Sequence, residues 1–229
     1  MGGCRIVVGV DGPYRVEGEP PPLLRTAMVE TEFGEPTAWD EGPSFVTRPG
    51  MELCRCGGSG RKPFCDGSHE RNGFDGTEVA DRTPSSARRE AWEGDGVVMT
   101  DDRSFCAQAG FCGDRFTNVW EMIDGTTDPE VRERLMGMVQ RCPSGRLAYS
   151  VPPVDDDLEP SFEPSVGVEP NGPLWVRGGI PIVSEGGEPY EVRNRQTLCR
   201  CGRSRNKPFC DGMHKVVGFT DPATPEPQT

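Results

Sequence analysis

The chain has 229 residues and a formal net charge of −12; only 34% of its residues are hydrophobic, and it contains 30 glycines and 23 prolines. The acidic balance argues against a nucleic-acid-binding protein, because the phosphates would be repelled. So small an apolar fraction predicts small modules that need disulfides or bound metals for stability, and the ten cysteines can supply either.

The cysteines are better explained as ligands than as disulfides. The N-terminus, MGGCRIVVGVDG, has no cleavable apolar stretch, and no run approaches the ~18 apolar residues needed to cross a membrane. We therefore expect a cytoplasmic protein without a membrane segment. In such a reducing compartment clustered cysteines are more often metal ligands.

Two related β-hairpins are predicted, one in each half of the chain. Residues 8–18 read VGVDGPYRVEG, and residues 166–178 read VGVEPNGPLWVRG. In each, two β-rich runs meet at Asp-Gly or Asn-Gly, dipeptides that tolerate the positive φ angles of a type I′ turn. The separation between hairpin and cysteines is longer in the first half, which predicts an insertion around residues 19–24 and 38–40.

A pair of cysteine-rich loops follows the hairpins. Residues 53–69 read LCRCGGSGRKPFCDGSH, and residues 198–214 read LCRCGRSRNKPFCDGMH. Both have the spacing C-x-C-x8-C-x3-H, and together they contain both histidines of the chain. Asp66 and Asp211 are expected to accept backbone N–H bonds and to open a short helical turn that carries the histidine. The candidate ligands are Cys54, Cys56, Cys65 and His69 in the first loop and Cys199, Cys201, Cys210 and His214 in the second.

Three thiols and one imidazole allow two kinds of metal centre. They would satisfy a tetrahedral zinc ion, or they would hold a [2Fe–2S] cluster with two ligands on each iron. Zinc loops usually pair their cysteines with two to four residues between them, so the tight C-x-C pair favours iron–sulfur. The spacing by itself leaves both possibilities open.

Both loops resemble the CDGSH iron–sulfur family, whose pattern is C-x-C-x2-[ST]-x3-P-x-C-D-G-[STA]-H. The first loop matches throughout, and the second departs only at Met213, which lies between two ligands. The resemblance implies one [2Fe–2S] cluster in each loop. Single-motif members form homodimers whose strands build a β-cap, so a chain with two motifs is expected to be a monomer that reproduces this dimer around a pseudo-twofold axis.

The region between the two loops has a different character. Polar, proline-rich segments at 75–90 and 150–165 are predicted linkers. Between them, residues 97–100 predict a short strand, and residues 127–140 predict an amphipathic helix capped by Thr127. The apolar face of that helix comprises Val131, Leu135, Met138 and Val139.

Three cysteines of the middle region form a further candidate cluster site. Cys106 and Cys112 are separated by five residues, and Cys142 precedes Pro143 after the predicted helix, as the last ligand does in small ferredoxins. The segment resembles a divergent single-cluster ferredoxin domain, although Ala109 stands where that family has a middle ligand. Three cysteines suit a [3Fe–4S] cluster. A [4Fe–4S] cluster with a water or carboxylate ligand, and a domain without any cluster, stay open.

The predicted fold is a β-rich α+β protein with four parts. The first CDGSH module spans residues 1–76, the ferredoxin-like domain 91–149, the second CDGSH module 163–221, and a disordered tail 222–229. The two modules are expected to form the pseudo-twofold β-cap, with the ferredoxin-like α+β domain inserted between them.

We expect an iron–sulfur protein that passes single electrons to an unidentified redox partner through two [2Fe–2S] clusters and one [3Fe–4S] cluster. A neutral imidazole in place of a thiolate raises the reduction potential, and it makes the cluster easier to release in acid. Cluster storage, cluster transfer or redox and pH sensing is therefore the alternative, and a structural zinc module is a second one. Both histidines are committed as ligands, so no catalytic pair can be assembled and we do not expect an enzyme.

Overall fold

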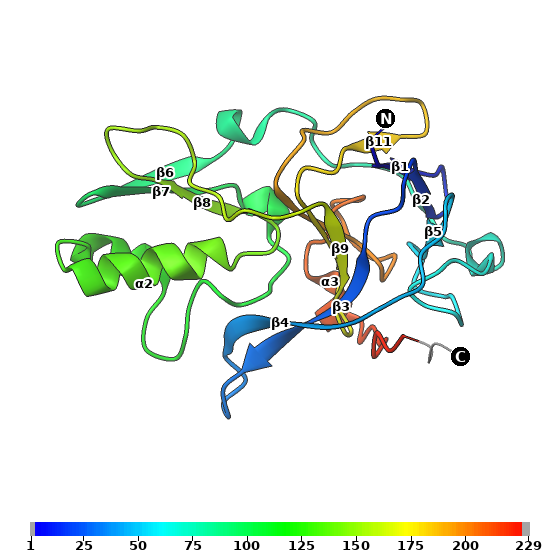
Figure 1. The fold of residues 1–229 in the computed structure, drawn as a ribbon, viewed down its shortest axis with the longest axis horizontal. Coiled ribbons are helices and arrows are strands. Elements are labelled where there is room, and N and C mark those ends of the chain that lie inside the picture. Colours follow the sequence, from blue (N-terminus) through cyan, green and yellow to red (C-terminus); the bar gives the residue numbers. More distant parts are fainter. Residues whose placement is uncertain (1–2, 226–229) are drawn as a thin grey trace.

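The computed structural model describes residues 3–225, which fold mainly into short strands arranged in three sheets. The three-stranded sheet of the middle region and its helix lie at one end of the long axis, and the first strands of the chain lie at the other (Figure 1). No helix within the described residues is long and apolar enough to span a membrane.

The first sheet contains β1 (Arg5–Val8), β2 (Tyr14–Glu17), β5 (Glu52–Leu53) and β11 (Ile182–Ser184), in the order β11-β1-β2-β5. Strands β1, β2 and β5 come from the first half of the chain and pair antiparallel. Strand β11 comes from the second half and pairs parallel to β1. The first sheet is therefore completed by the second half of the chain.

The second sheet contains β9 (Ser165–Val168), β10 (Leu174–Arg177), β12 (Arg195–Leu198), β3 (Leu23–Glu30) and β4 (Pro36–Ser44), in the order β12-β10-β9-β3-β4. Here β9, β10 and β12 pair antiparallel, and β3 of the first half pairs parallel to β9. The two halves thus exchange a strand in the same way, which confirms the predicted pseudo-twofold β-cap. Both sheets contribute to one hydrophobic core that includes Ile6, Val8, Val166, Val168 and Leu198.

The two predicted hairpins are β1–β2 and β9–β10, but their turns are not of type I′. That turn needs positive φ at both central residues. Each loop has only one such residue, Asp11 with φ 46° and Asn171 with φ 55°. The Gly12 N–H bonds to the Gly9 carbonyl over 3.3 Å, within a five-residue loop closed by the Val8–Tyr14 pair. The longer loop lets the turn reach the cysteine-rich segment, as described below.

The extra residues of the first half form the long β3–β4 hairpin, at the place where the insertion is predicted. This hairpin reaches the middle region. The indole Nε1 of Trp39 donates to the Arg141 carbonyl over 3.0 Å, and its ring centre lies 4.9 Å from that of Phe111. The β3–β4 hairpin therefore packs the first half of the chain against the inserted domain.

The inserted domain consists of the antiparallel strands β6 (Glu90–Gly94), β7 (Val97–Asp101) and β8 (Leu147–Ser150), with helices α1 (Val119–Met122) and α2 (Pro129–Gln140). The structure confirms the predicted strand at residues 97–100. Short 3₁₀ turns lie at Ser85–Ala87, Arg103–Phe105 and Ile123–Gly125.

Helix α2 begins one residue later than predicted. Its N-cap is Asp128, whose carboxylate accepts the Glu130 N–H over 2.9 Å, and not Thr127. Asp is as good a cap as Thr, and capping from Asp128 puts Pro129 at the first helical position, where its missing N–H is no loss. Leu135, Met138 and Val139 are buried, as the apolar pattern predicts.

The segments that flank the modules are attached to the fold. In the 75–90 linker, the Val79 and Ala80 N–H groups donate to the Lys207 carbonyl. At the C-terminal end, Asp221 and Ala223 are buried. Of the tail for which disorder is predicted, residues 226–229 lie outside the described part of the chain.

Candidate metal centres

The four donors of each CDGSH loop lie as two close pairs. In the first loop, the sulfurs of Cys54 and Cys56 are 3.9 Å apart, and Cys65 Sγ is 3.4 Å from His69 Nδ1. A tetrahedral metal with metal–sulfur bonds of about 2.3 Å separates two ligand sulfurs by about 3.8 Å. Each pair is therefore spaced to share one metal ion.

The second loop repeats this arrangement. The sulfurs of Cys199 and Cys201 are 3.7 Å apart, and Cys210 Sγ is 3.3 Å from His214 Nδ1. The structure thus brings together, in two sets, all eight donors expected from the sequence. Among residues 3–225, no three Cys, His, Asp or Glu side chains are placed to hold a single metal ion.

The aspartate after the third cysteine shapes each loop as expected. Asp66 Oδ1 accepts the Ser68 N–H over 3.0 Å, and Oδ2 accepts the Gly60 N–H over 2.8 Å. The Ser68 hydroxyl, together with these two backbone N–H groups, holds the pKa of Asp66 below its usual value. The chain then turns at Gly67, with φ 80°, into a 3₁₀ turn (Ser68–Glu70) that carries His69.

In the second loop, Asp211 accepts the Arg205 N–H over 2.7 Å and the Met213 N–H over 3.1 Å. The turn that follows is helix α3 (Met213–Val216). The unusual Met213 thus takes part in the helical turn through its backbone, and its side chain does not disturb the ligand spacing.

The pKa values of the donors are shifted in both directions. Burial raises the pKa of Cys54 to about 11 and also raises that of Cys210, whereas the hydrogen bond with Cys201 lowers the pKa of Cys199 to about 6. Burial, with Lys215 and Arg200, lowers the pKa of His214 to about 4. His214 is therefore a neutral imidazole at pH 7, the form that binds a metal, whereas a thiol such as that of Cys210 must lose its proton when a metal binds.

Two buried arginines that sequence reasoning missed support the loops. Arg55 and Arg200 stand between the first two cysteines of each loop and are 1% and 2% exposed. Arg55 donates to the Gly9 carbonyl, over 2.6 Å, and to the Gly76 carbonyl. The sequence LCRCG, present in both loops, could have indicated these arginines, because the same residue stands between the first two cysteines in both copies.

Arg200 makes the corresponding contacts and adds an ion pair. It donates to the carbonyl oxygens of Glu169 and, over 2.8 Å, Gly172, and pairs with the carboxylate of Asp221. Each arginine thus joins a hairpin turn to the chain segment that follows the histidine. This is why the hairpin loops lie beside the metal-binding loops.

Glu169 is a buried carboxylate of the second hairpin; at the equivalent position of the first hairpin stands Gly9. Burial raises the pKa of Glu169 to about 7, although Arg200 and Lys215 act in the opposite direction. Because the pKa of Glu169 is higher in the folded than in the unfolded protein, the folded protein binds a proton at this carboxyl more tightly. Stability from this group is complete below about pH 4.5 and is lost as the pH rises toward 7.

Replacing Glu169 with glutamine is therefore expected to stabilise the protein at pH 8 by about 3 kcal/mol, from about 1.4 kcal/mol per pKa unit. The gain should shrink as the pH falls toward 5. Urea unfolding of both proteins at pH 5.5 and pH 8 measures this. An equal difference at the two pH values would show that Glu169 is already ionised in the folded protein.

The two loops also contact each other. Cys56 and Cys201 form an isolated antiparallel bridge. Gly57 and Gly202 follow them, with φ 77° and 74°. In addition, the hydroxyl of Tyr14, in the first half, lies 2.9 Å from the Cys199 carbonyl and donates into the second loop. The two centres are therefore neighbours across the pseudo-twofold axis.

The three cysteines of the inserted domain line one cavity. Cys106, Cys112 and Cys142 face it together with Ala109, the residue that stands in place of a ligand. Asp114, the acidic residue nearest in sequence, does not line this cavity, because its carboxylate pairs with Arg134 and accepts backbone N–H bonds. The structure thus assembles the three predicted donors without that carboxylate.

Two family models match the segments that contain these donors. The family model described as "Iron-binding zinc finger CDGSH type" matches residues 11–70 and 171–215, and the model described as "Divergent 4Fe-4S mono-cluster" matches residues 92–152. No curated protein matches the chain. The fold and the soft thiolate and imidazole donors define an iron–sulfur cluster-binding protein. Within that class, the chain contains two segments that match the CDGSH family model and, between them, one that matches the divergent 4Fe–4S mono-cluster model.

Proposed function

We propose that this protein transfers single electrons and holds a [2Fe–2S] cluster in each CDGSH loop. The observation that carries the proposal is the division of each donor set into two pairs, one of two thiols and one of a thiol and an imidazole. Two pairs match two irons with two protein ligands each. A structural zinc ion would need all four donors around a single point.

For the inserted domain we propose a [3Fe–4S] cluster. Three cysteines on one cavity supply one ligand to each of three irons, and Ala109 has no donor atom. A [4Fe–4S] cluster would need a fourth ligand from water, because the carboxylate of Asp114 is held by Arg134.

When bound, such clusters accept and release one electron at a time. The protein sets the reduction potential of the clusters through their ligands and through the hydrogen bonds around them. Neutral imidazoles at His69 and His214 raise the potential relative to four thiolates. The Gly67 and Gly212 N–H groups point at the sulfurs of Cys65 and Cys210 over 3.4 Å and favour the thiolate form.

Cluster transfer or redox and pH sensing is the second candidate function. It is favoured by one observation: Cys65 and His69 are partly exposed, so an acceptor can reach this pair. An apo-acceptor that gains iron and sulfide from the protein would support cluster transfer. Reversible redox cycling with no loss of iron would support electron transfer.

The proposal also covers the partner, the oligomeric state and the compartment of the protein. We infer an electron carrier and not an enzyme, acting as a monomer with an unidentified redox protein as partner. A reducing compartment such as the cytoplasm is supported by the cysteines, since all ten lie within the described residues and are free thiols.

Metal analysis of anaerobically purified protein tests this function. We expect roughly seven irons with matching sulfide per chain, from two [2Fe–2S] clusters and one [3Fe–4S] cluster, and reversible one-electron reduction in a potentiometric titration. Roughly eight irons would replace the three-iron proposal with [4Fe–4S], and roughly four would leave the inserted domain empty. Stoichiometric zinc without sulfide would overturn electron transfer altogether.

A further inference from the structure

The two CDGSH loops differ in their exposure to solvent, although their donors have the same spacing. Three of the four donors in the first loop are partly exposed, whereas all four in the second loop are buried. The partly exposed donors are Cys56, Cys65 and His69, and their buried counterparts are Cys201, Cys210 and His214, with exposed fractions of 6%, 2% and 5%. A repeated sequence has thus produced two unlike sites.

The cysteine-bearing loop of the inserted domain covers the second site. Lys215 Nζ donates to the Gln108 carbonyl over 2.7 Å, and Asn206 Nδ2 donates to the Ser104 carbonyl, also over 2.7 Å. The Gln108 side chain lies directly on Gly212, where an added Cβ would come within 2.5 Å of its Cγ and Cδ. We call these three contacts, Gln108–Gly212, Gln108–Lys215 and Ser104–Asn206, the inserted-domain seal.

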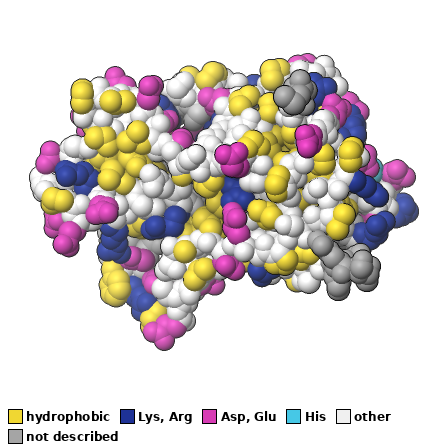
Figure 2. Space-filling view, viewed as in Figure 1, with side chains coloured by type: hydrophobic (Ala, Val, Ile, Leu, Met, Phe, Trp, Pro, Cys, Tyr) yellow, Lys and Arg dark blue, Asp and Glu magenta, His cyan; other side chains and the backbone are white. Residues whose placement is uncertain are grey.

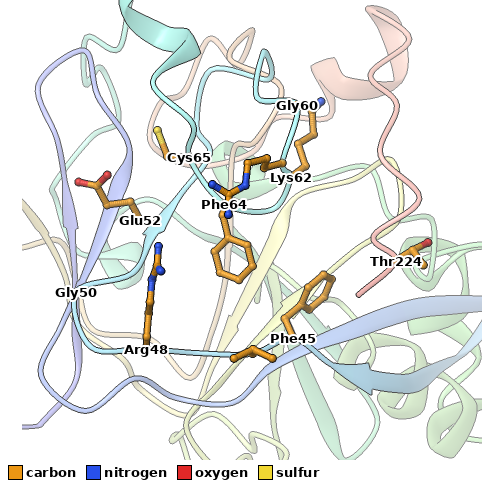
Figure 3. A pocket seen from close by; sticks show the side chains of 11 residues that line it. Phe45, Arg48, Gly50, Glu52, Gly60, Lys62, Phe64, Cys65 and Thr224 are labelled. Atoms are coloured by element: carbon orange, nitrogen blue, oxygen red, sulfur yellow. The ribbon is translucent and has the colours of Figure 1, made fainter. Parts of the chain in front are cut away.

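Aromatic packing closes the same side. The rings of Phe105 and Phe209 meet edge to face, with centres 5.1 Å apart. The counterpart of Phe209 in the first loop is Phe64, whose ring meets Phe45 edge to face at the longer distance of 6.3 Å and also lines an open cavity of about 510 Å³ beside Cys65 (Figure 3). The first loop is therefore open at the place where the second is filled.

Within residues 3–225, the first loop has no equivalent of the seal. The position of Gly212 corresponds to Gly67, where an added Cβ would meet only Arg71 Nη1, at 4.0 Å. The position of Lys215 corresponds to Glu70, whose carboxylate lies 4.0 Å from His69 Nε2 in its own loop. The inserted domain and the first strands lie at opposite ends of the molecule (Figure 1), and the contacts of the seal go to the second loop.

We propose that the two CDGSH centres have different roles: the first is the exchange site, open to solvent and to partner molecules, and the second is retained beneath the inserted-domain seal. This inference rests on the proposed function, because it takes each loop to hold a cluster. The cavity beside Cys65 is lined by Arg48, Arg61 and Lys62, with Glu52 as its carboxylate. Figure 2 shows Lys and Arg side chains interspersed with Asp and Glu over the surface, whereas the lining of this cavity has three cationic side chains and one carboxylate, which favours the approach of anionic reagents.

A chelator challenge with site-resolved detection tests the proposal. The iron-loaded protein is treated with EDTA in the presence of iodoacetamide, and alkylation of each cysteine is followed by peptide mass spectrometry. We expect Cys56 and Cys65 to be labelled at least about tenfold faster than Cys201 and Cys210, because a sealed group reacts only through local opening. Equal rates in the two loops would overturn the proposal.

Two substitutions examine whether the inserted domain is responsible. Gln108→Gly removes the side chain that covers Gly212 and suits the positive φ of 58° at this position, so it should not disturb folding. Combined with Lys215→Ala, it is expected to bring labelling of the second loop close to the rate of the first. Val216→Ala, next to Lys215 on α3 and 71% exposed, is the matched control and should change neither rate.

Unchanged protection of Cys201 and Cys210 in the Gln108→Gly/Lys215→Ala protein would show that the inserted domain is not the seal and would overturn that assignment. Iron, zinc and sulfide are measured on the same sample before the challenge. Zinc without sulfide would refute the proposed function, whereas full iron loading with equal labelling rates would refute only the difference between the two centres.

Discussion

Replacing Arg200 with methionine is expected to lower the free energy of unfolding by roughly 3–5 kcal/mol, the usual cost of removing one partner from a buried ion pair. Arg200 is 2% exposed, and its partner Asp221 is also buried. The substitution leaves that carboxylate without its counter-ion and two buried carbonyl groups without a donor. Urea unfolding monitored by circular dichroism measures the loss.

Two further proteins make this result specific. Arg203 is exposed, and Arg203→Met should change stability by less than about 0.5 kcal/mol. Adding Asp221→Asn to Arg200→Met should recover part of the loss, because the unpaired charge is removed. If Arg200→Met unfolded at the same urea concentration as the unmodified protein, the ion pair would have no structural role and the link between hairpin and loop would lie elsewhere.

The second large effect is expected where the two metal-binding loops meet. An alanine Cβ at Gly57 would lie 2.8 Å from the Cys201 carbonyl oxygen, and one at Gly202 would lie 2.7 Å from that of Cys56. Both glycines also have positive φ. Gly202→Ala should therefore cost roughly 3 kcal/mol, combining about 1–2 for the left-handed conformation with about 1–3 for overpacking.

Gly50→Ala separates these two contributions. Gly50 has φ 71°, close to the 74° of Gly202, but has no atom within 4 Å of an added Cβ. Its substitution should cost only about 1–2 kcal/mol. Thermal melting and iron content are the measurements, and we expect Gly202→Ala to lose iron from both CDGSH loops because the backbones must move apart. Equal losses for the two variants would mean that the loop contact is not tight.

Several features of the site follow from local sequence. The spacing of Cys54, Cys56, Cys65 and His69 places four donors within one loop, and the aspartate after the third cysteine bonds to backbone N–H groups only a few residues away. Helix α2 is also local, because its apolar pattern repeats with the helical period. Its start was predicted one residue early, since Thr127 and Asp128 are both acceptable caps and only the final geometry selects one.

Contacts between distant segments could not be predicted from the sequence. The functions of Arg55 and Tyr14 depend on which carbonyl groups face them, and those groups lie far along the chain. The turn of each hairpin was misjudged for a related reason. Asp-Gly permits a two-residue type I′ turn, but the longer loop allows the Gly9 and Glu169 carbonyls to accept bonds from the buried arginines.

By itself, the sequence determined the repeated donor sets, the inserted domain and the resemblance of both loops to the CDGSH family, because ligand chemistry and short-range spacing are local properties. The tertiary structure alone decided that strands β3 and β11 are exchanged between the halves, that Cys56 meets Cys201, and that Gln108 lies on Gly212. Parallel pairing and domain contacts depend on the packing of residues far apart in the chain, which no local pattern records. Two nearly identical loops thus become an open site and a closed one, since the single inserted domain packs against only the second.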